Sequence, residues 1–397
     1  MVRLMLASSI PFRLRVLGRF AVAVTLLASG SLQAGATPLT FSFTAVGTLV
    51  GLQTSNPLLY AKVTNGFSAA GAFWSSQFRD AITINVDIDY PALAPGTLGS
   101  TNFESLAVYY SDVRTALAFD RTSADDRQAT ANLPAGSSLS FLTNNTLTGA
   151  LEIDADNTPN NYALDVSRAN LKALGFYQNG FLTPNDTTRD ATISLSSGYA
   201  WDFDRSNGIT AGTFDFVGVA IHELGHAMGF SSGVDIVDTV SAPNGNAQFL
   251  GTDLDPYAVF SVLDLYRHGA RNGGGLDFAA GGTGANNPYF SIDGGVTSLG
   301  MFSTGRLNGD GRQAGHWKDN LGLGILDPTF APGELGMVTP LDVRALDVIG
   351  YDLVVVPEPT AAAFILPAVM AILIGARAGM RAPRLNRGPA RINQPRE

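Results

Sequence analysis

The chain has 397 residues, of which 45% are hydrophobic and 15% charged, with a formal net charge of −9 and no cysteine. The lack of cysteine excludes disulfides, thiol chemistry and cysteine-ligated metals. The acidic excess argues against a nucleic-acid partner, because phosphate backbones are bound by clusters of lysine and arginine, and it suits a protein that stays soluble outside the cell.

The first 36 residues have the three parts of a secretory signal peptide. Residues 1–19 carry four arginines and no acid, residues 20–33 are mainly apolar, and Ala34-Gly-Ala36 offers small residues for cleavage. The apolar run is too short for a comfortable membrane span. We therefore expect residues 1–36 to be removed during export, with an uncleaved anchor as the alternative.

The next stretch alternates between strand and helix patterns. Residues 82–88 alternate isoleucine or valine with polar residues, which is the period of a half-buried strand. Residues 66–80 place apolar residues at helical spacing. The further expected elements are an N-terminal strand segment at 37–65, short strands between turns at 91–160, a helix at 162–175 and a strand at 192–196. Together these elements predict an α+β fold.

The sequence of residues 222–226 is His-Glu-Leu-Gly-His, which matches the H-E-x-x-H pattern. His222 and His226 stand one helical turn apart, so both rings project from one helix face and can share a metal ion. Glu223 is placed to act on a metal-activated water as general base. The three side chains predict a zinc site.

The context of the motif favours a real site over a chance match in a core helix. Apolar residues recur every three or four positions through 214–228, as in a half-buried helix. Thr213 or Asp215 can cap the start of this helix, and Gly229 ends it three residues after the second histidine.

The motif and its glycine resemble the metzincin clan of zinc peptidases, whose pattern H-E-x-x-H-x-x-G-x-x-H continues to a third histidine. This chain keeps the glycine, as Gly229, but has Ser232 where that histidine would stand. Another residue must therefore complete the site.

Four downstream residues are candidates for the third ligand. Glu334 is the next glutamate after the motif, but it lies more than a hundred residues further along the chain, which makes it a weak candidate. The sequence around His268 favours a surface histidine, or one that supports the site without binding the metal. His316 lies in a polar loop and precedes a tryptophan, and this pair resembles the His-Trp element of leishmanolysin-like metzincins, which carry a long insertion before their third histidine. We predict His316 as the ligand, with Asp235 as the alternative because some metzincins use aspartate.

The remaining segments before the C-terminus are an insertion loop and a closing helix. Residues 269–286 are rich in glycine and predict a flexible loop. The resemblance places a methionine-containing turn beneath the zinc; the matching stretch, 324–328, has Leu326 at that position, and Met337 is the alternative. Residues 339–350 begin with Thr-Pro and end in glycine, which predicts the clan's closing helix.

The C-terminus, residues 357–387, has the form of a second sorting signal. Pro357-Glu-Pro359 precedes an apolar run at 361–376 and an arginine-rich end. This resembles the PEP-CTERM signal of Gram-negative bacteria, although a plain membrane anchor is the alternative. The resemblance implies transient membrane association through 361–376, a sorting machinery as partner, and release to the cell envelope or exterior.

The combination is similar to a bacterial family of secreted metalloproteases with a PEP-CTERM tail, over about residues 65–359. It implies a two-lobed metalloprotease domain at 66–355, with a twisted sheet and helices above an irregular lower lobe. It also implies that an edge strand at 192–196 pairs with a protein or peptide substrate. The expected function is that of a secreted zinc endopeptidase, a hydrolase with His222, His226 and His316 as Zn²⁺ ligands.

Two further possibilities stay open at this point. One is a non-enzymatic surface or matrix protein whose structural or degenerate zinc site is closed by a fourth ligand such as Asp235. The other is a calcium site, since the chain is acidic, although it has no D-x-D-x-D-G loop. The candidate pairs for Ca²⁺, which surface solvation also explains, are Asp202 with Asp204 and Asp253 with Asp255.

Overall fold

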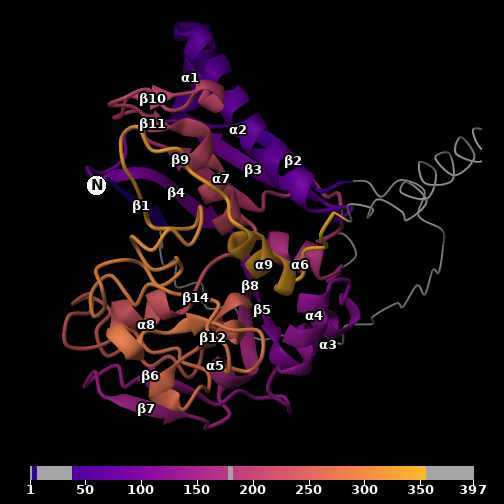
Figure 1. Cartoon of the computed structure of the whole chain (residues 1–397), viewed down its shortest axis with the longest axis vertical. Coiled ribbons are helices and arrows are strands. Elements are labelled where there is room, and N and C mark those ends of the chain that lie inside the picture. The colour runs from indigo at the N-terminus through magenta and orange to yellow at the C-terminus, as the bar shows by residue number, and fades with distance from the viewer. Residues whose placement is uncertain (1, 7–37, 178–181, 355–397) are drawn as a thin grey trace, which may run out of the picture. The chain divides into compact units, whose positions relative to one another are not determined.

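The computed structural model describes residues 2–6, 38–177 and 182–354, and these form an α+β fold as predicted (Figure 1). The predicted sorting signal at 357–387 and all but residues 2–6 of the predicted signal peptide lie outside the described residues. Within the described part of the chain, no helix is both long enough and apolar enough to cross a membrane.

A mixed six-stranded sheet forms the framework, in the spatial order β15, β1, β4, β9, β3 and β2. Strands β2, β3 and β9 are parallel, and β4 runs antiparallel to β9. The strands are β1 (Val2–Leu6), β2 (Thr40–Ala45), β3 (Thr83–Asp89), β4 (Thr97–Phe103), β9 (Ala191–Leu195) and β15 (Thr329–Phe330). The prediction of an edge strand at 192–196 is wrong, because β9 is internal and β4 lies outside it.

Two helices cover one face of this sheet. Helix α2 (Pro57–Gln77) packs on β2, and α7 (Phe216–Ala227) packs on β4, β9 and α2 (Figure 1). The helices approach closely because a Cβ at Gly66 of α2 would lie only 2.4 Å from the ring of Phe216. The indole of Trp74 donates to the carbonyl of Ile221 at 3.0 Å, which ties α2 to the middle of α7.

Two predictions made from the sequence, for residues 37–65 and 162–175, need correction. Part of the segment predicted as extended is helical instead: α1 spans Gly47–Ser55, and α2 begins at Pro57. Asn56 separates the two helices and caps α2 by accepting a hydrogen bond from the Leu59 N–H. The predicted helix at 162–175 is divided: Tyr162 ends α5, residues 163–167 form strand β8, and Arg168–Ala173 are helical, as α6. Short apolar runs fit both periods, and pairing with β5 decides in favour of a strand.

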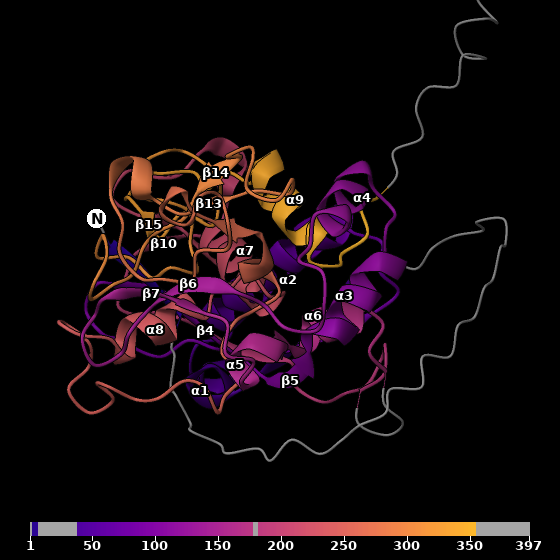
Figure 2. The same cartoon turned by 90° about the horizontal axis from the view of Figure 1, so that it is seen from below.

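The other elements are short. Helix α4 packs on α9 (Figure 2). The 3₁₀ helices are Arg205–Asn207, Leu263–Tyr266, Ala270–Asn272 and Gly284–Asn286. The remaining α-helices are α3 (Tyr110–Phe119), α4 (Ala124–Ala131), α5 (Pro159–Tyr162), α8 (Val234–Val240) and α9 (Pro340–Val348). The paired strands are β5 (Ser105–Tyr109) with β8 (Ala163–Ser167), β6 (Phe141–Asn144) with β7 (Leu151–Asp154), β10 (Trp201–Asp202) with β11 (Phe214–Asp215), and β12 (Arg267–His268) with β13 (Tyr289–Phe290) and β14 (Gly300–Met301).

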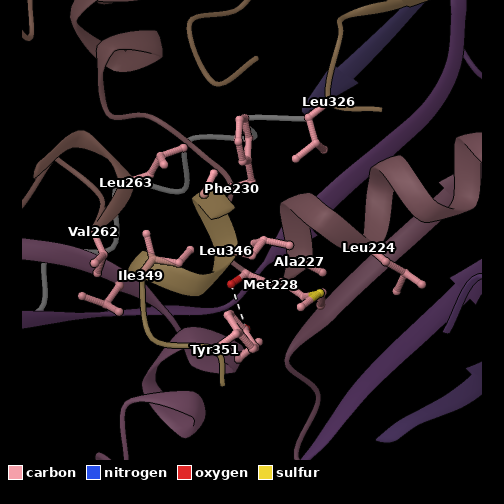
Figure 3. Packing of buried hydrophobic residues seen from close by; sticks show 14 of the residues in the cluster. Leu224, Ala227, Met228, Phe230, Val262, Leu263, Leu326, Leu346, Ile349 and Tyr351 are labelled. Carbon is pink, nitrogen blue, oxygen red and sulfur yellow. Dashed lines mark hydrogen bonds between the residues drawn. The ribbon is translucent and has the colours of Figure 1, made fainter. Parts of the chain in front are cut away.

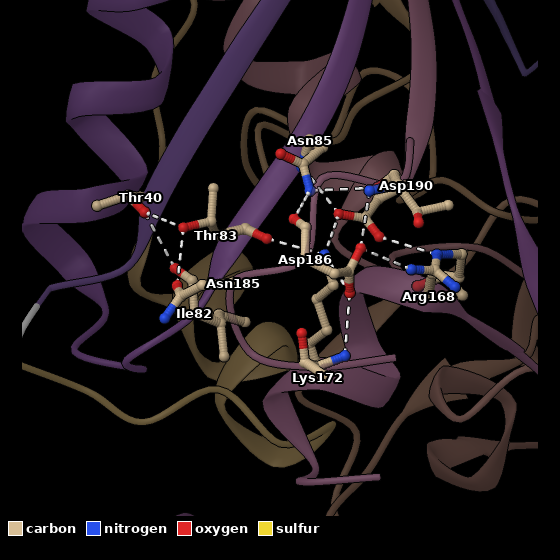
Figure 4. Close-up of polar contacts among 12 residues, drawn as sticks. Thr40, Ile82, Thr83, Asn85, Arg168, Lys172, Asn185, Asp186 and Asp190 are labelled. Atoms are coloured by element: carbon tan, nitrogen blue, oxygen red, sulfur yellow. Dashed lines mark hydrogen bonds and ion pairs between the residues drawn. The ribbon is translucent and has the colours of Figure 1, made fainter. Parts of the chain in front are cut away.

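A buried ion-pair network anchors α6 to the start of β9 (Figure 4). Asp190 accepts from Lys172 Nζ at 2.6 Å, from Arg168 Nε at 3.1 Å and from the backbone of Asn85 at 2.8 Å. Lys172 and Asp190 are fully buried. Removing one member of such a network would leave an uncompensated buried charge, at a cost of about 3–5 kcal/mol.

Candidate metal centre

Helix α7 carries the H-E-x-x-H motif, and all of its residues are buried. It begins at Asp215, one of the two predicted caps, whose carboxylate accepts from the Gly218 N–H at 2.8 Å. It ends at Met228, whose carbonyl accepts from the Tyr351 hydroxyl at 2.8 Å (Figure 3). Gly229 follows with a φ of 112°, which favours glycine and turns the chain away.

The structure brings His222, His226 and His316 together. The Nε2 atom of His226 lies 2.9 Å from that of His222 and 3.1 Å from that of His316. In the part of the chain that the structure describes, these residues are the only group of three or more potential metal ligands close enough to hold one ion. Two nitrogens on a tetrahedral zinc ion lie about 3.3 Å apart, given Zn–N distances of about 2.0–2.1 Å, so the spacing fits a metal.

The other ring nitrogen of each histidine faces a backbone carbonyl. Nδ1 of His222 lies 2.7 Å from the Ile325 oxygen, Nδ1 of His226 lies 2.6 Å from the Phe230 oxygen, and Nδ1 of His316 lies 3.3 Å from that of Gln313. Carbonyls only accept hydrogen bonds, so each neutral imidazole carries its proton on Nδ1. Three Nε2 lone pairs therefore point at one another, an arrangement that a cation stabilises.

The electrostatics favour neutral imidazoles. Burial lowers the pKa of His226 to about 4, and burial together with the neighbouring His226 holds the pKa values of His222 and His316 well below the ordinary value. Neutral imidazole is the form that binds metals. The donor set thus fits a divalent ion such as zinc.

Glu223 follows His222 in the sequence and is fully buried. Its Oε2 accepts from the hydroxyl of Thr101 on β4 at 2.6 Å, and its Oε1 has no hydrogen-bond partner among the described residues. Burial raises the pKa of the Glu223 carboxyl to about 8, and the Thr101 hydrogen bond acts in the opposite direction. A cation held by the three histidines would favour the ionised, basic form.

Asp235, the alternative third ligand, has a different position. Its two carboxylate oxygens accept from the backbone N–H groups of Ala314 at 2.6 Å and Gly315 at 3.1 Å. Asp235 therefore holds the loop that carries His316. Burial raises the pKa of Asp235 to about 7, and these two hydrogen bonds oppose the shift.

The residues that depart from the metzincin pattern have structural partners. Ser232 donates to Asp264 at 2.5 Å, which fixes the turn after α7 to the segment at 261–264. His268 lies on β12 with its Nδ1 2.8 Å from the Gly274 oxygen, and Glu334 accepts from the backbone of Ala331. Neither His268 nor Glu334 belongs to the three-histidine group.

Leu326 lies beneath α7. A Cβ at Gly225, between the two motif histidines, would be 2.8 Å from a methyl group of Leu326. The alternative residue, Met337, is 62% exposed and so cannot support the site from below. Of the two candidates, Leu326 is therefore the residue that packs against the motif helix.

Asp342, on α9, is a buried residue that sequence reasoning missed. Its carboxylate accepts from the indole of Trp317 at 2.8 Å and from the backbone N–H groups of Ile325 and Leu326 at 3.0 and 3.3 Å. It also completes the capping box with Thr339. The Thr-Pro-Leu-Asp sequence signals the cap but not these contacts, which arise only when distant loops pack against the start of α9.

The candidate calcium pairs lie apart from this centre. Asp202 and Asp204 accept from Thr210 and Ser206, and these hydrogen bonds lower the pKa values of both carboxyls. Asp253 accepts from the backbone of Asp255. These contacts are those of solvated surface turns.

No family model, curated protein or solved structure matches this chain.

Proposed function

We propose that the chain is a zinc-dependent endopeptidase in which His222, His226 and His316 hold the ion. The observation that carries the proposal is the position of the His222 and His316 Nε2 atoms at 2.9 and 3.1 Å from that of His226, with the buried Glu223 next to His222 in the sequence. No fourth protein ligand accompanies the three histidines in the described residues. That pattern is typical of catalytic rather than structural zinc sites.

Zinc bound there would act as a Lewis acid and lower the pKa of a water to about 7. Glu223 is the residue that handles protons. Its free oxygen, Oε1, accepts the proton of the attacking water and returns it to the leaving amine of the peptide. The Nδ1 contacts of the histidines keep their rings in the orientation that aims Nε2 at the ion.

A metzincin-like architecture is part of the proposal. Support comes from the sheet and helices that position α7, from Leu326 beneath it, and from the mainly irregular chain after α8 that carries His316. Removal of residues 1–36 would take away β1, which pairs with one edge of β4. In this arrangement β4, which packs on α7, is the strand that an extended peptide substrate would approach.

Export to the envelope or exterior of a Gram-negative bacterium is a further part of the proposal. It rests on the sequences of the two ends, which resemble sorting signals. Intact-mass measurement of the exported protein tests it. Mature protein that begins near residue 37 and ends near Pro359 is expected, and an unprocessed chain would contradict it.

The test of activity compares the purified wild type with Glu223→Gln. Zinc per chain is measured by elemental analysis, and hydrolysis is followed on a labelled unfolded protein. We expect close to one zinc in both and a loss of hydrolysis of at least about 100-fold in the variant, the scale of a lost general base. Hydrolysis that persists in Glu223→Gln would refute the role of Glu223.

One observation favours a second function, that of a non-enzymatic protein with a structural ion. His222, Glu223, His226 and His316 are each at most 1% exposed, as expected of a closed site. A structural ion predicts full zinc occupancy, a large loss of thermal stability on chelation and no hydrolysis by the wild type. Both functions predict a bound zinc, so hydrolysis by the zinc-loaded wild type is the measurement that separates them.

A further inference from the structure

One strand of the sheet holds the carboxylate of Glu223. Thr101 lies on β4, is 1% exposed, and places its hydroxyl 2.6 Å from Glu223 Oε2 and 3.0 Å from the Glu223 carbonyl oxygen. The contact joins residues that are 122 positions apart in the sequence. No other side-chain hydrogen bond to Glu223 occurs among the described residues.

Gly99, two positions earlier on β4, encloses the other carboxylate oxygen. Residues two apart on a strand face the same side. A Cβ at Gly99 would lie 2.3 Å from Glu223 Oε1 and 2.8 Å from a methyl group of Leu195 on β9. Any side chain at position 99 would therefore displace the carboxylate, which has room only because this residue is glycine.

The two contacts give the oxygens of Glu223 different roles. Oε2 is occupied by the Thr101 hydroxyl, whereas Oε1 is buried and has no partner in the described structure. Without the Thr101 hydrogen bond, the carboxylate would be free to rotate about the last side-chain torsion, whose distribution is broad for glutamate. Anchoring Oε2 fixes the direction in which Oε1 points.

We propose that Thr101 is a positioning residue, which acts through Glu223 and orients its carboxylate for proton transfer. This inference rests on the proposed endopeptidase function. Thr101 touches neither the ion nor the substrate in this scheme. Its contribution is geometric, because misplacement of a catalytic group by about 1 Å can lower the rate about 100-fold.

The test uses three variants of the full chain in a peptide-hydrolysis assay. Thr101→Val keeps the shape but removes the hydroxyl, and Thr101→Ser restores it. Thr97→Val is the matched control, because Thr97 lies on the same strand, is 3% exposed, and has a hydroxyl without a partner among the described residues. We expect kcat to fall about 10- to 100-fold in Thr101→Val with KM little changed, to return in Thr101→Ser and to stay unchanged in Thr97→Val.

A second readout does not depend on activity. Crystal structures of the zinc-loaded wild type and of Thr101→Val show where the Glu223 carboxylate lies, and melting temperatures exclude unfolding as the cause. We expect the carboxylate to leave β4 in the valine variant. If it keeps its place there, or if Thr101→Val retains wild-type kcat, the positioning role is overturned.

The two proposals fail in different ways. A wild type that binds zinc without hydrolysing peptides refutes the endopeptidase, while the crystallographic comparison still decides whether Thr101 orients Glu223. Hydrolysis that is lost equally in Thr101→Val and Thr101→Ser, with an unmoved carboxylate, refutes Thr101 alone.

Discussion

The carboxylate of Asp235 accepts a hydrogen bond of 2.6 Å from the backbone N–H of Ala314, two residues before His316. Asp235 lies on α8, directly after the turn that follows the motif helix. The aspartate that the sequence offers as a rival ligand thus holds the loop of the histidine that lies against His226. Partners of this kind orient metal ligands, and their loss lowers metal affinity about 10- to 100-fold.

We therefore expect Asp235→Asn to weaken zinc binding by about 10- to 100-fold without unfolding the chain. The amide keeps one acceptor oxygen, but its NH₂ group would face a backbone donor. Competition with a chelator of known affinity measures the change. The exposed Asp204→Asn serves as control, and equal affinity in Asp235→Asn and wild type would remove Asp235 from the site.

Replacing each of the two non-motif histidines separates their roles. His316→Ala is expected to lose zinc, because only two ring nitrogens would remain at the centre. His268→Ala is expected to keep zinc, since His268 contacts the carbonyl of Gly274 instead. Zinc per chain after dialysis measures both. Retention of a full equivalent by His316→Ala would show that another residue supplies the third ligand.

Chelation is expected to lower the melting temperature of the wild type and to leave that of His316→Ala unchanged. An ion that binds only the folded chain stabilises it by mass action, and here it would connect α7 with the distant loop at His316. Differential scanning calorimetry with and without a chelator measures the shift. No change on chelation of zinc-loaded wild type would argue against an ion at this centre.

Asp342→Ala is expected to reduce the free energy of unfolding by about 3–5 kcal/mol, because it leaves several buried donors unsatisfied at once. Those donors include the indole of Trp317 and the backbone of Ile325, whose carbonyl faces His222. Urea denaturation measures the loss. Asp202→Ala, on the surface, is the control, and a loss below about 1 kcal/mol would show that the loops hold their place without Asp342.

The free energy of unfolding is expected to fall as the pH rises, because several aspartates have raised pKa values in the folded chain. Burial, followed by neighbouring carboxylates, raises the pKa of Asp80 to about 8, of Asp120 to about 10 and of Asp347 to about 7, from 3.8. Between about pH 4 and pH 8 the folded chain thus binds more protons than the unfolded chain, so the free energy of unfolding decreases with rising pH.

Asp120→Asn should reduce this dependence and raise the melting temperature at pH 8 relative to the wild type, with little change near pH 4. Thermal unfolding across this pH range measures it. Glu152→Gln, on the exposed strand β7, controls for the loss of one charge. A wild-type melting temperature that rises between pH 5 and pH 8 would contradict the sign of the expected effect.

Local patterns predicted part of the fold because their physical cause is local. The alternation at 82–88 became β3, and Thr339 and Asp342 form the capping box expected at the start of α9. The prediction of a helix at 162–175 was wrong because the spacing of Leu164 and Val166 fits both a helix and a strand. Only pairing with β5 selects the strand. The sequence also did not predict that β4 pairs with β9 and makes β9 an internal strand, because strand order depends on the whole sheet.

By itself, the sequence determined that His222 and His226 share one face of a helix, with Glu223 next to the first of them, because a spacing of four residues is about one turn of a helix. It also narrowed the third ligand to His316 or Asp235. Only the tertiary structure shows which of these residues meets the motif: the His316 ring lies against His226, whereas both Asp235 oxygens accept from the backbone. The tertiary structure also places Thr101 and Gly99 against Glu223. Such contacts join segments about a hundred residues apart. They depend on how the sheet and helices pack, so no periodic pattern in the sequence indicates them.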